Sequence, residues 1–379
     1  MGDRIINLLI AIILLIIIGL GLLYAYKVLD DKGYEVSIPT IEEIKEGKTI
    51  VISQKDNKTN TIITTLEPVA TLPPYSSEEQ KNINNSSKTI LSKENNNKYY
   101  YKQLSDYSKI IYDSIANNID ELTKGNHTIN IDYNFYDLLT KENGSEMLHK
   151  YYDDAVYALN LDIAGLFYID LSKMSLNIEK TTTMFNVTYR LYIDNGENAN
   201  YFSESFYSKS QVEEAIEKIN NIVDSVTENV SGSKYAKAKS VHDWLIEYLE
   251  YSGDSPDKGT IYGACIEKKA VCEGYSRLYK YMLDKLEIEN VLVVGTATNS
   301  TGSTEDHMWN YLKIDETWYA VDPTWDDPIV YGNGRITEEI THAYFMVGSD
   351  KLFQNHVEET VRKETGTKFE VPTLGKNNY

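Results

Sequence analysis

The sequence predicts an α+β protein, and three observations support this fold class. Apolar residues recur at helical spacing after Cys272 and in several earlier segments. Residues 184–193 alternate in the manner of a strand, and residues 307–321 contain two short apolar runs around a turn. A long apolar run precedes all of these elements. We therefore expect one apolar span, a polar connecting region and a folded part that mixes helices with strands.

The apolar run from Ile5 to Tyr26 contains 22 residues and one strongly polar side chain, Asn7. A helix of this length covers roughly 33 Å, which exceeds the ~30 Å core of a bilayer. Its end, Leu22-Leu-Tyr-Ala-Tyr26, lacks the small residues of a signal-peptide cleavage site, so we expect an uncleaved signal-anchor. Flanking charges favour residues 1–4 in the cytoplasm and the C-terminal domain outside. The expected location is the cell membrane, with a single pass and an extracellular C-terminal domain.

The chain after the apolar run divides by composition. Residues 27–97 are polar and low in complexity, which is typical of a disordered stalk, with candidate short strands at 51–53 and 61–64. Residues 98–230 read as an α+β region and residues 231–379 as a second domain. In 98–230 we expect helices over 104–115, 147–159 and 212–226, and strands over 166–169, 176–178 and 184–193.

The net charge limits the classes of partner. The chain has 37 basic and 57 acidic residues, which gives −20 with histidine neutral. Phosphate binding requires a basic face, so this balance argues against nucleic acid. The 31 tyrosines suit a binding surface, although a general compositional bias explains them equally well.

Cys272 lies in the segment Lys269-Ala-Val-Cys-Glu-Gly-Tyr-Ser276, immediately before a helical pattern that continues to Leu286. This places the thiol at a helix N-terminus, where unpaired N–H groups and the helix dipole favour an anion. Glu273 opposes this effect through its charge. Cys265, seven residues earlier, is either a buried free thiol or a disulfide partner that would silence Cys272.

A predicted hairpin carries His307 and Asp322. We expect a buried strand over 290–295 and strands over 307–314 and 318–321, joined around Asp315-Glu316. A two-residue turn would pair Trp309 with Asp322, which leaves Asp322 one diagonal step from His307 on the same face. Diagonal neighbours are roughly 7–8 Å apart at the backbone, within reach of an imidazole–carboxylate hydrogen bond.

A thiol, an imidazole and a carboxylate are the groups that nucleophilic acyl transfer requires. His307 and Asp322 alone could also be a surface pair or two metal ligands. No further ligands occur at zinc-site spacing, so we expect no metal and no cofactor. His242 reads as a packed structural histidine, with a catalytic role as the alternative.

Three segments together resemble the transglutaminase-like superfamily, in particular its bacterial cell-surface branch of clostridial type. They are Lys269–Ser276, His307-Met-Trp-Asn310 and Trp318-Tyr-Ala-Val-Asp-Pro-Thr-Trp-Asp-Asp-Pro328. The resemblance implies a papain-like fold, in which a helix bearing the cysteine packs on an antiparallel sheet bearing the histidine and the aspartate. It implies Cys272 as nucleophile, His307 as general acid/base and Asp322 as the group that orients the imidazole.

Further expectations follow from this resemblance. Trp309 and Trp325 are candidates for walls of the site, or else for packing, and the backbone N–H of Cys272 is the candidate oxyanion donor. We expect a cysteine acyltransferase that acts on amides of surface proteins or cell-wall peptide through a thioester. A cysteine peptidase or amidase with the same triad, or a non-catalytic surface binding module, are the alternatives.

Overall fold

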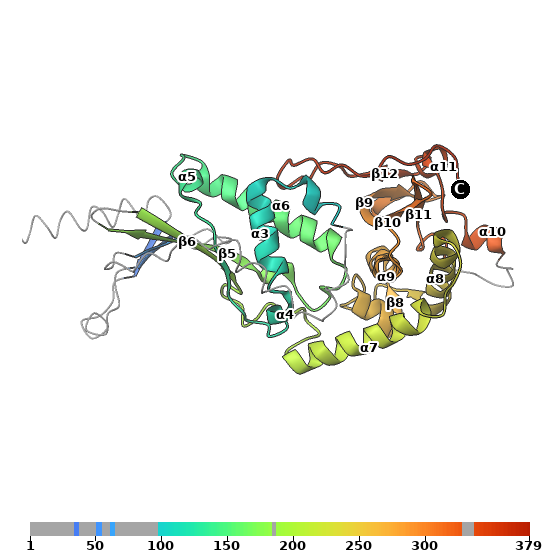
Figure 1. The fold of residues 1–379 in the computed structure, drawn as a ribbon, viewed down its shortest axis with the longest axis horizontal. Coiled ribbons are helices and arrows are strands. Elements are labelled where there is room, and N and C mark those ends of the chain that lie inside the picture. Colours follow the sequence, from blue (N-terminus) through green and yellow to red (C-terminus); the bar gives the residue numbers. More distant parts are fainter. Residues whose placement is uncertain (1–33, 38–50, 55–60, 65–97, 184–186, 328–336) are drawn as a thin grey trace, which may run out of the picture. The chain divides into compact units, whose positions relative to one another are not determined.

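The computed structural model describes residues 34–37, 51–54, 61–64, 98–183, 187–327 and 337–379 (Figure 1). The chain divides into two compact units. Unit 1 consists of Met1–Pro74, Thr128–Ser145 and Met174–Gly196, and unit 2 consists of Tyr75–His127, Glu146–Lys173 and Glu197–Tyr379. Both units mix helices with strands, so the predicted α+β class is confirmed.

Unit 1 is built on a six-stranded sheet with the strand order β1-β2-β3-β5-β6-β4. Its long hairpin pairs Leu176 with Ile193 and Ile178 with Leu191, and all four side chains are buried on one face. This alternation of apolar and polar residues is what the sequence predicts for a half-buried strand. The elements of unit 1 are β1 (Tyr34–Ser37), β2 (Val51–Gln54), β3 (Thr61–Thr64), β4 (Ile129–Ile131), α5 (Tyr136–Leu139), β5 (Ser175–Thr182) and β6 (Val187–Asp194).

Serine residues begin three of the main helices of unit 2. The Ser105, Ser208 and Ser233 side chains each accept a hydrogen bond from the backbone N–H three residues later, which caps α3, α7 and α8. Gly232, with φ of +100°, separates α7 from α8 as the sequence predicts. These helices are α3 (Asp106–Ala116), α4 (Ile119–Leu122), α6 (Gly144–Asp162), α7 (Lys209–Thr227) and α8 (Lys234–Tyr248).

The sheet of unit 2 is antiparallel and has the strand order β11-β10-β9-β12. The β10–β11 hairpin pairs Ile314 with Thr317, which is the predicted register. Asp315 and Glu316 form its turn with φ of 48° and 65°, the left-handed pair that suits the twist of a two-residue hairpin. The strands are β9 (Asn290–Thr298), β10 (Thr304–Ile314), β11 (Thr317–Val321) and β12 (His356–Glu358).

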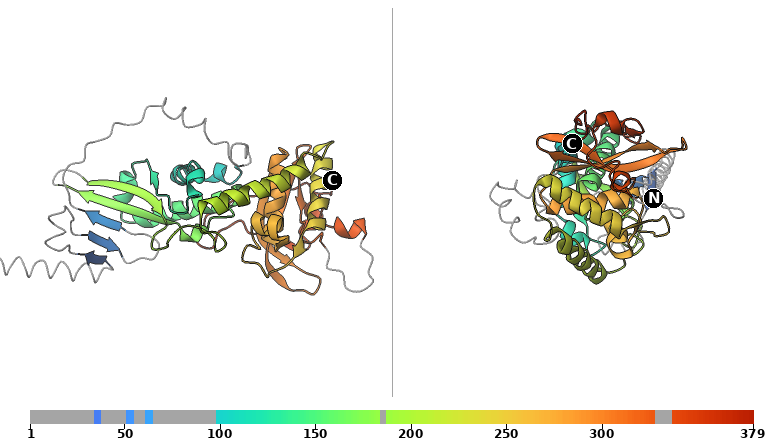
Figure 2. Two further views of the ribbon diagram at one scale, coloured as in Figure 1. Left: turned by 90° about the horizontal axis from the view of Figure 1, so that it is seen from below. Right: turned by 90° about the vertical axis from the view of Figure 1, so that its right-hand side faces the viewer.

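Helix α9 (Cys272–Lys285) packs against β9 and β10, alongside α7 and α8 (Figures 1 and 2). It is buried on nearly every side, including Lys280, whose ammonium pairs with Asp284 at 3.0 Å. Two buried side-chain hydrogen bonds join the helix to β10: Ser276 Oγ donates to the Met308 carbonyl at 2.9 Å, and Asn310 Nδ2 donates to the Ser276 carbonyl at 3.0 Å. They fix the position of the helix relative to the strand that carries His307.

The remaining elements of unit 2 are short. A parallel pair of two-residue strands precedes α9, and two single-turn helices lie between β11 and β12 in the chain. They are β7 (Glu250–Tyr251), β8 (Lys269–Ala270), α10 (Glu338–Thr341) and α11 (Ser349–Leu352).

Several sequence predictions need correction or fall outside the described residues. The segment 166–169 is not a strand, because only Ile169 makes an isolated bridge, to Phe202. The candidate strands at 51–53 and 61–64 are confirmed as β2 and β3 in the sheet of unit 1. Most of the stretch 27–97 that was predicted as a stalk lies outside the described residues, and the division at 230/231 stays a prediction.

The predicted membrane span over 5–26 lies outside the described residues. Within the part of the chain that the structure describes, no helix combines the length and the apolar character needed to cross a bilayer.

We expect Asn310→Ala to lower the free energy of unfolding by about 1–3 kcal/mol, because it leaves the buried Ser276 carbonyl without this donor. Urea unfolding followed by circular dichroism measures the change. Asn221→Ala, at an exposed position on α7, is the matched control and should lie within about 0.5 kcal/mol of wild type. Equal losses in both variants would contradict this account of how α9 is fixed to β10.

Candidate active site

Cys272 is the first residue of α9 and carries a free, partly exposed thiol. Val271 before it is extended and supplies no side-chain cap, and the first helical hydrogen bond runs from Tyr275 N–H to the Val271 carbonyl at 3.1 Å. The N–H groups of 272–274 are therefore the open, positive end of the helix. A Cβ at Gly274 would collide with the Lys258 carbonyl, so glycine permits the close packing that seats this helix end.

Asp322 lies directly after β11, and its carboxylate is fully buried. Oδ1 accepts hydrogen bonds from the backbone N–H groups of Thr324 at 3.0 Å and Trp325 at 3.2 Å. Oδ2 lies 2.7 Å from His307 Nε2 and 3.1 Å from His356 Nε2. Burial alone would raise the pKa of Asp322, but the charge and hydrogen bonds of the two histidines hold it well below its usual value.

His307 projects from β10, and its side chain is 7% exposed. With Nε2 bonded to Asp322, the ring has Nδ1 left to exchange a proton with another group. Burial by itself would lower the pKa of His307, but the Asp322 carboxylate and, to a smaller extent, the Cys272 side chain raise it to about 10. The ring is therefore an imidazolium at neutral pH, and it interacts with the thiol on one side and the carboxylate on the other.

The structure brings Cys272, His307 and Asp322 together from three separate elements, and the predicted His307–Asp322 hydrogen bond is present. Sequence reasoning missed His356, which shares the same carboxylate oxygen. Its neighbours along the chain show no motif. Only the antiparallel pairing of β12 with β9 brings it to the site, and no local pattern encodes that pairing.

The two tryptophans proposed as walls lie on His307. Trp309 is fully buried and stacks on its ring at 6.0 Å between centroids, so it supports the imidazole from the core. Trp325 is partly buried, 5.7 Å from His307 and 4.6 Å from His356. Trp325 is thus the one of the two that can also face solvent or a substrate.

Cys265 is fully buried in a short π-helix, Gly263–Glu267, and is not paired with Cys272. Burial raises the pKa of its thiol to about 12, which makes it unreactive at neutral pH. Tyr251 is 42% exposed, and burial together with the charge of the Cys272 side chain raises the pKa of its hydroxyl.

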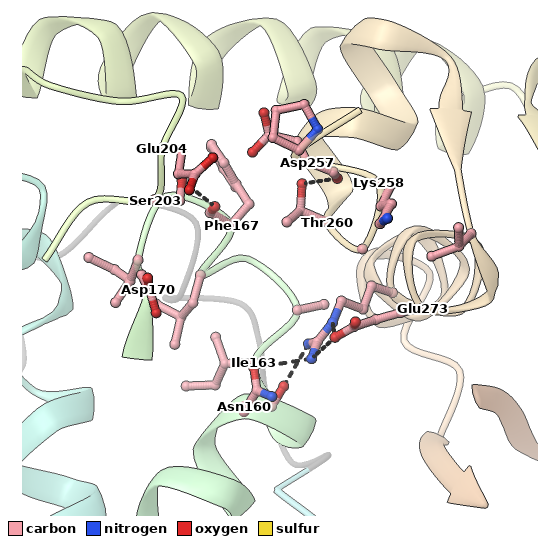
Figure 3. Close-up of a pocket in the computed structure, with 17 residues that line it drawn as sticks. Asn160, Ile163, Phe167, Asp170, Ser203, Glu204, Asp257, Lys258, Thr260 and Glu273 are labelled. Atoms are coloured by element: carbon pink, nitrogen blue, oxygen red, sulfur yellow. Dashed lines mark hydrogen bonds and ion pairs between the residues drawn. The ribbon is translucent and has the colours of Figure 1, made fainter. Parts of the chain in front are cut away.

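A pocket of about 460 Å³ opens beside the first turns of α9 (Figure 3). Val271 and Glu273, the two neighbours of Cys272 in the chain, both line it. Arg277 on its wall is held by Glu273 at 2.8 Å and by the Asn160 carbonyl at 2.7 Å. The ionisable residues that line the pocket are Asp170, Glu204, Asp257 and Glu273 against Lys258 and Arg277, so carboxylates outnumber cations.

Two groups of described residues have ligand atoms close enough to hold a metal ion: His307, Asp322 and His356, and a second group around His242. The sequence suggested no such cluster because each group contains at least one ligand from an element far away in the chain. In the first group, His307 Nε2 already donates to Asp322 and the ring interacts with Cys272, which favours proton transfer over metal binding. His242 lies in the second group and does not join the thiol.

Comparison with known families identifies the domain. Residues 220–323 match the family model of the transglutaminase-like superfamily. The chain carries a transglutaminase-like domain. Members of this superfamily are cysteine proteases and acyltransferases, and the matched segment includes the Cys272, His307 and Asp322 positions.

Two solved structures are similar to this chain. One is described as a TGase, with 14% identity over 51% of this chain and 53% of that chain and a TM-score of 0.28. The other is the periplasmic domain of TgpA from Pseudomonas aeruginosa, with 13% identity over 37% of this chain and 55% of that chain and a TM-score of 0.23. The chain thus spans about half the length of each. No curated protein matches it.

We expect iodoacetamide to alkylate Cys272 far faster than Cys265 at pH 7, because Cys272 is partly exposed and interacts with His307, whereas Cys265 is buried with a raised pKa. Mass spectrometry of peptides against time measures both rates. His307→Ala should slow Cys272 at least about tenfold and leave Cys265 unchanged. A Cys272 rate that does not depend on His307 would show that the ring does not activate the thiol.

The pH dependence of stability tests the His307–Asp322 pair. Because the folded-state pKa of His307 is about 10, above ~6.5 in the unfolded chain, its stabilisation is fully present below pH ~6.5 and is lost as pH rises to about 10. The difference in unfolding free energy between wild type and His307→Gln should shrink by on the order of a few kcal/mol over this range. For Asn221→Ala the difference should stay flat. A constant difference for His307→Gln would refute the raised pKa.

Proposed function

We propose that this protein is a cysteine acyltransferase with Cys272 as nucleophile, His307 as general acid/base and Asp322 as the orienting carboxylate. One observation carries the proposal: the His307 ring lies between a fully buried carboxylate and a thiol at a helix N-terminus. Asp322 fixes the tautomer and orientation of the ring, so that Nδ1 is the nitrogen that exchanges a proton with substrate.

The reaction begins when the Cys272 thiolate attacks the carbonyl carbon of an amide. Negative charge then develops on the carbonyl oxygen, and the backbone N–H of Cys272 at the open end of α9 is a donor suited to stabilise it. His307 gives its proton to the leaving nitrogen, which departs as ammonia from a glutaminyl side chain or as an amine from a peptide. The resulting thioester is resolved by a second nucleophile, whose proton His307 accepts.

The charge of the pocket beside α9 favours an amine as the second nucleophile. The chain neighbours of Cys272 line this pocket, and Cys272 itself does not. The carboxylates of the pocket outnumber its cations, and one of its cations, Arg277, is already held by Glu273 and Asn160. A protonated primary amine, such as a lysine side chain, complements this charge. Transfer to an amine is therefore our first choice, and hydrolysis by a peptidase with the same residues is the second.

The place of action that we propose is the cell surface, with an extracellular C-terminal domain anchored through the apolar run 5–26. The substrates would then be glutaminyl or peptide amides of surface proteins or cell-wall peptide. The proposed anchoring rests on the length of that run and on the charges that flank it.

Amine incorporation tests the proposed reaction. The full chain is incubated with a glutaminyl peptide and fluorescent cadaverine, and products are analysed by mass spectrometry. We expect a mass gain from the added amine, reduced at least ~10³-fold in Cys272→Ala because the nucleophile is absent. Cys265→Ala, which removes the buried thiol, is the matched control and should retain the activity.

Other outcomes separate the alternatives. New peptide termini without amine incorporation, again dependent on Cys272, would identify a peptidase. Full activity in Cys272→Ala would refute the nucleophile. If wild type forms neither product and Cys272→Ala binds surface material as well as wild type, the domain is a binding module.

A further inference from the structure

A second histidine–carboxylate cluster lies apart from Cys272, where α8 meets the residue that ends α10. His242 and Asp243 are neighbours on α8, and His342 follows α10. Asp243 Oδ1 lies 3.1 Å from His242 Nδ1 and 2.7 Å from His342 Nε2. The three ligand atoms lie within 4.8 Å of one another.

The hydrogen bond of His242 Nε2 determines whether Nδ1, which faces Asp243, carries a proton. His242 is fully buried, and its Nε2 lies 3.2 Å from Oδ2 of Asp326, which is also fully buried. A carboxylate oxygen can only accept, so Nε2 carries the proton of a neutral ring. Nδ1 is then left with a lone pair that points at Asp243 Oδ1.

His342 is constrained in the same way. Its Nδ1 lies 3.0 Å from the backbone carbonyl oxygen of Glu338, which can only accept, so Nδ1 carries the proton. The Thr341 hydroxyl, 3.0 Å from the same nitrogen, can accept as well. Nε2 of a neutral His342 therefore also presents a lone pair to Asp243 Oδ1.

Two imidazole nitrogens thus face one carboxylate oxygen, and either a second proton on a ring or a metal cation among the three atoms would relieve the repulsion between them. We propose that His242 Nδ1, Asp243 Oδ1 and His342 Nε2 bind a divalent metal ion of the zinc class. A metal-bound histidine commonly donates a hydrogen bond from its other nitrogen to a carboxylate, and Asp326 is placed to accept that hydrogen bond from His242. This site is independent of the proposed acyl transfer.

The donor set indicates the class of ion. Two imidazole nitrogens and one carboxylate oxygen suit Zn²⁺ or Co²⁺, whereas Ca²⁺ and Mg²⁺ prefer oxygen ligands. Metal bonds of about 2.0–2.2 Å in a tetrahedral site place ligand atoms roughly 3.4 Å apart. The 3.1 Å and 2.7 Å contacts to Asp243 would lengthen on binding, and the two imidazole nitrogens, which lie within 4.8 Å of each other, would adopt the same spacing. The Asp243 side chain is 37% exposed, which leaves room for water as the fourth ligand.

The surrounding charges also favour a cation. Asp326 and the exposed Glu338 add negative charge, against one ammonium, that of Lys239. Lys239 Nζ lies 2.8 Å from Asp243 Oδ2, the oxygen that the cluster does not use. Asp243 would therefore bind the metal through Oδ1 alone.

The ion would act as a structural staple. Asp326 Oδ1 accepts from the Tyr344 backbone N–H at 2.8 Å, and the Asp326 N–H donates to the Asp322 carbonyl at 3.2 Å. A metal held by α8 and His342 therefore also restrains, through Asp326, the turn that begins at Asp322. Its main effect would be on stability, not on the chemical step.

Zinc retention tests the site. The full chain is stripped with a chelator, reloaded with one equivalent of ZnCl₂, dialysed and analysed for zinc by mass spectrometry. We expect wild type to retain one zinc ion per chain and to unfold several degrees higher than the stripped protein, because the ion binds the folded state alone. His342→Gln should lose both effects, and His356→Gln, which alters the other histidine–carboxylate group, should keep both.

Three results would overturn the proposal: no zinc retained by wild type, equal retention in His342→Gln, or loss of zinc in His356→Gln. If wild type retains no zinc, extra protons on the imidazole rings hold the cluster together. If His356→Gln loses its zinc, the ion belongs to the group around Asp322. If His342→Gln does not fold, X-ray absorption of the zinc-loaded wild type decides. In that spectrum, two imidazole ligands and no sulfur ligand support the site, provided that His356→Gln has retained its zinc. A sulfur ligand contradicts it.

Discussion

The arrangement of the candidate active site depends on one buried carboxylate, that of Asp322. Removing an ionised Asp322 from water would cost several kcal/mol without compensation. Four donors provide that compensation: two backbone N–H groups of the turn that follows, and one imidazole each from β10 and β12. Each donor offsets part of the cost of burying the charge. The carboxylate therefore specifies the turn, the orientation of His307 and the docking of β12 at the same time.

The position of the thiol follows from a second, independent constraint. Helix α9 is placed by hydrogen bonds of Ser276 and Asn310 that join it to β10. Ser276 is four residues from Cys272, and Asn310 is three residues from His307. The histidine and the cysteine thus meet because both are tied to the same strand. The relative position of Cys272 and His307 therefore depends on the rigid packing of a core helix against a sheet, and not on the conformation of a loop.

Local patterns in the sequence predicted the elements that carry the proposed triad. A two-residue turn between apolar strands determined the hairpin register, and register alone decides whether His307 and Asp322 share a face. The role of His356 could not be predicted, since it depends on a three-residue strand that pairs with β9 from 60 residues away. The strand expected at 166–169 failed because apolar residues of a buried turn carry the same local signal as a short strand.

Both histidine–carboxylate clusters of unit 2 contain two imidazoles that face one aspartate oxygen, and their surroundings give them different chemistry. At Asp322, His307 has a thiol beside its other nitrogen, and His356 Nδ1 lies 2.8 Å from the Asn355 side-chain oxygen, an amide that can offer either an acceptor or a donor. Protons can therefore be arranged freely in that cluster. At Asp243, His242 Nε2 faces the Asp326 carboxylate, and His342 Nδ1 faces the Glu338 carbonyl and the Thr341 hydroxyl. When these nitrogens hold the single proton of each neutral ring, the nitrogens that face Asp243 are free to bind a metal ion. The same residue types thus suit proton transfer at Asp322, where Cys272 interacts with His307, and the proposed metal ion at Asp243.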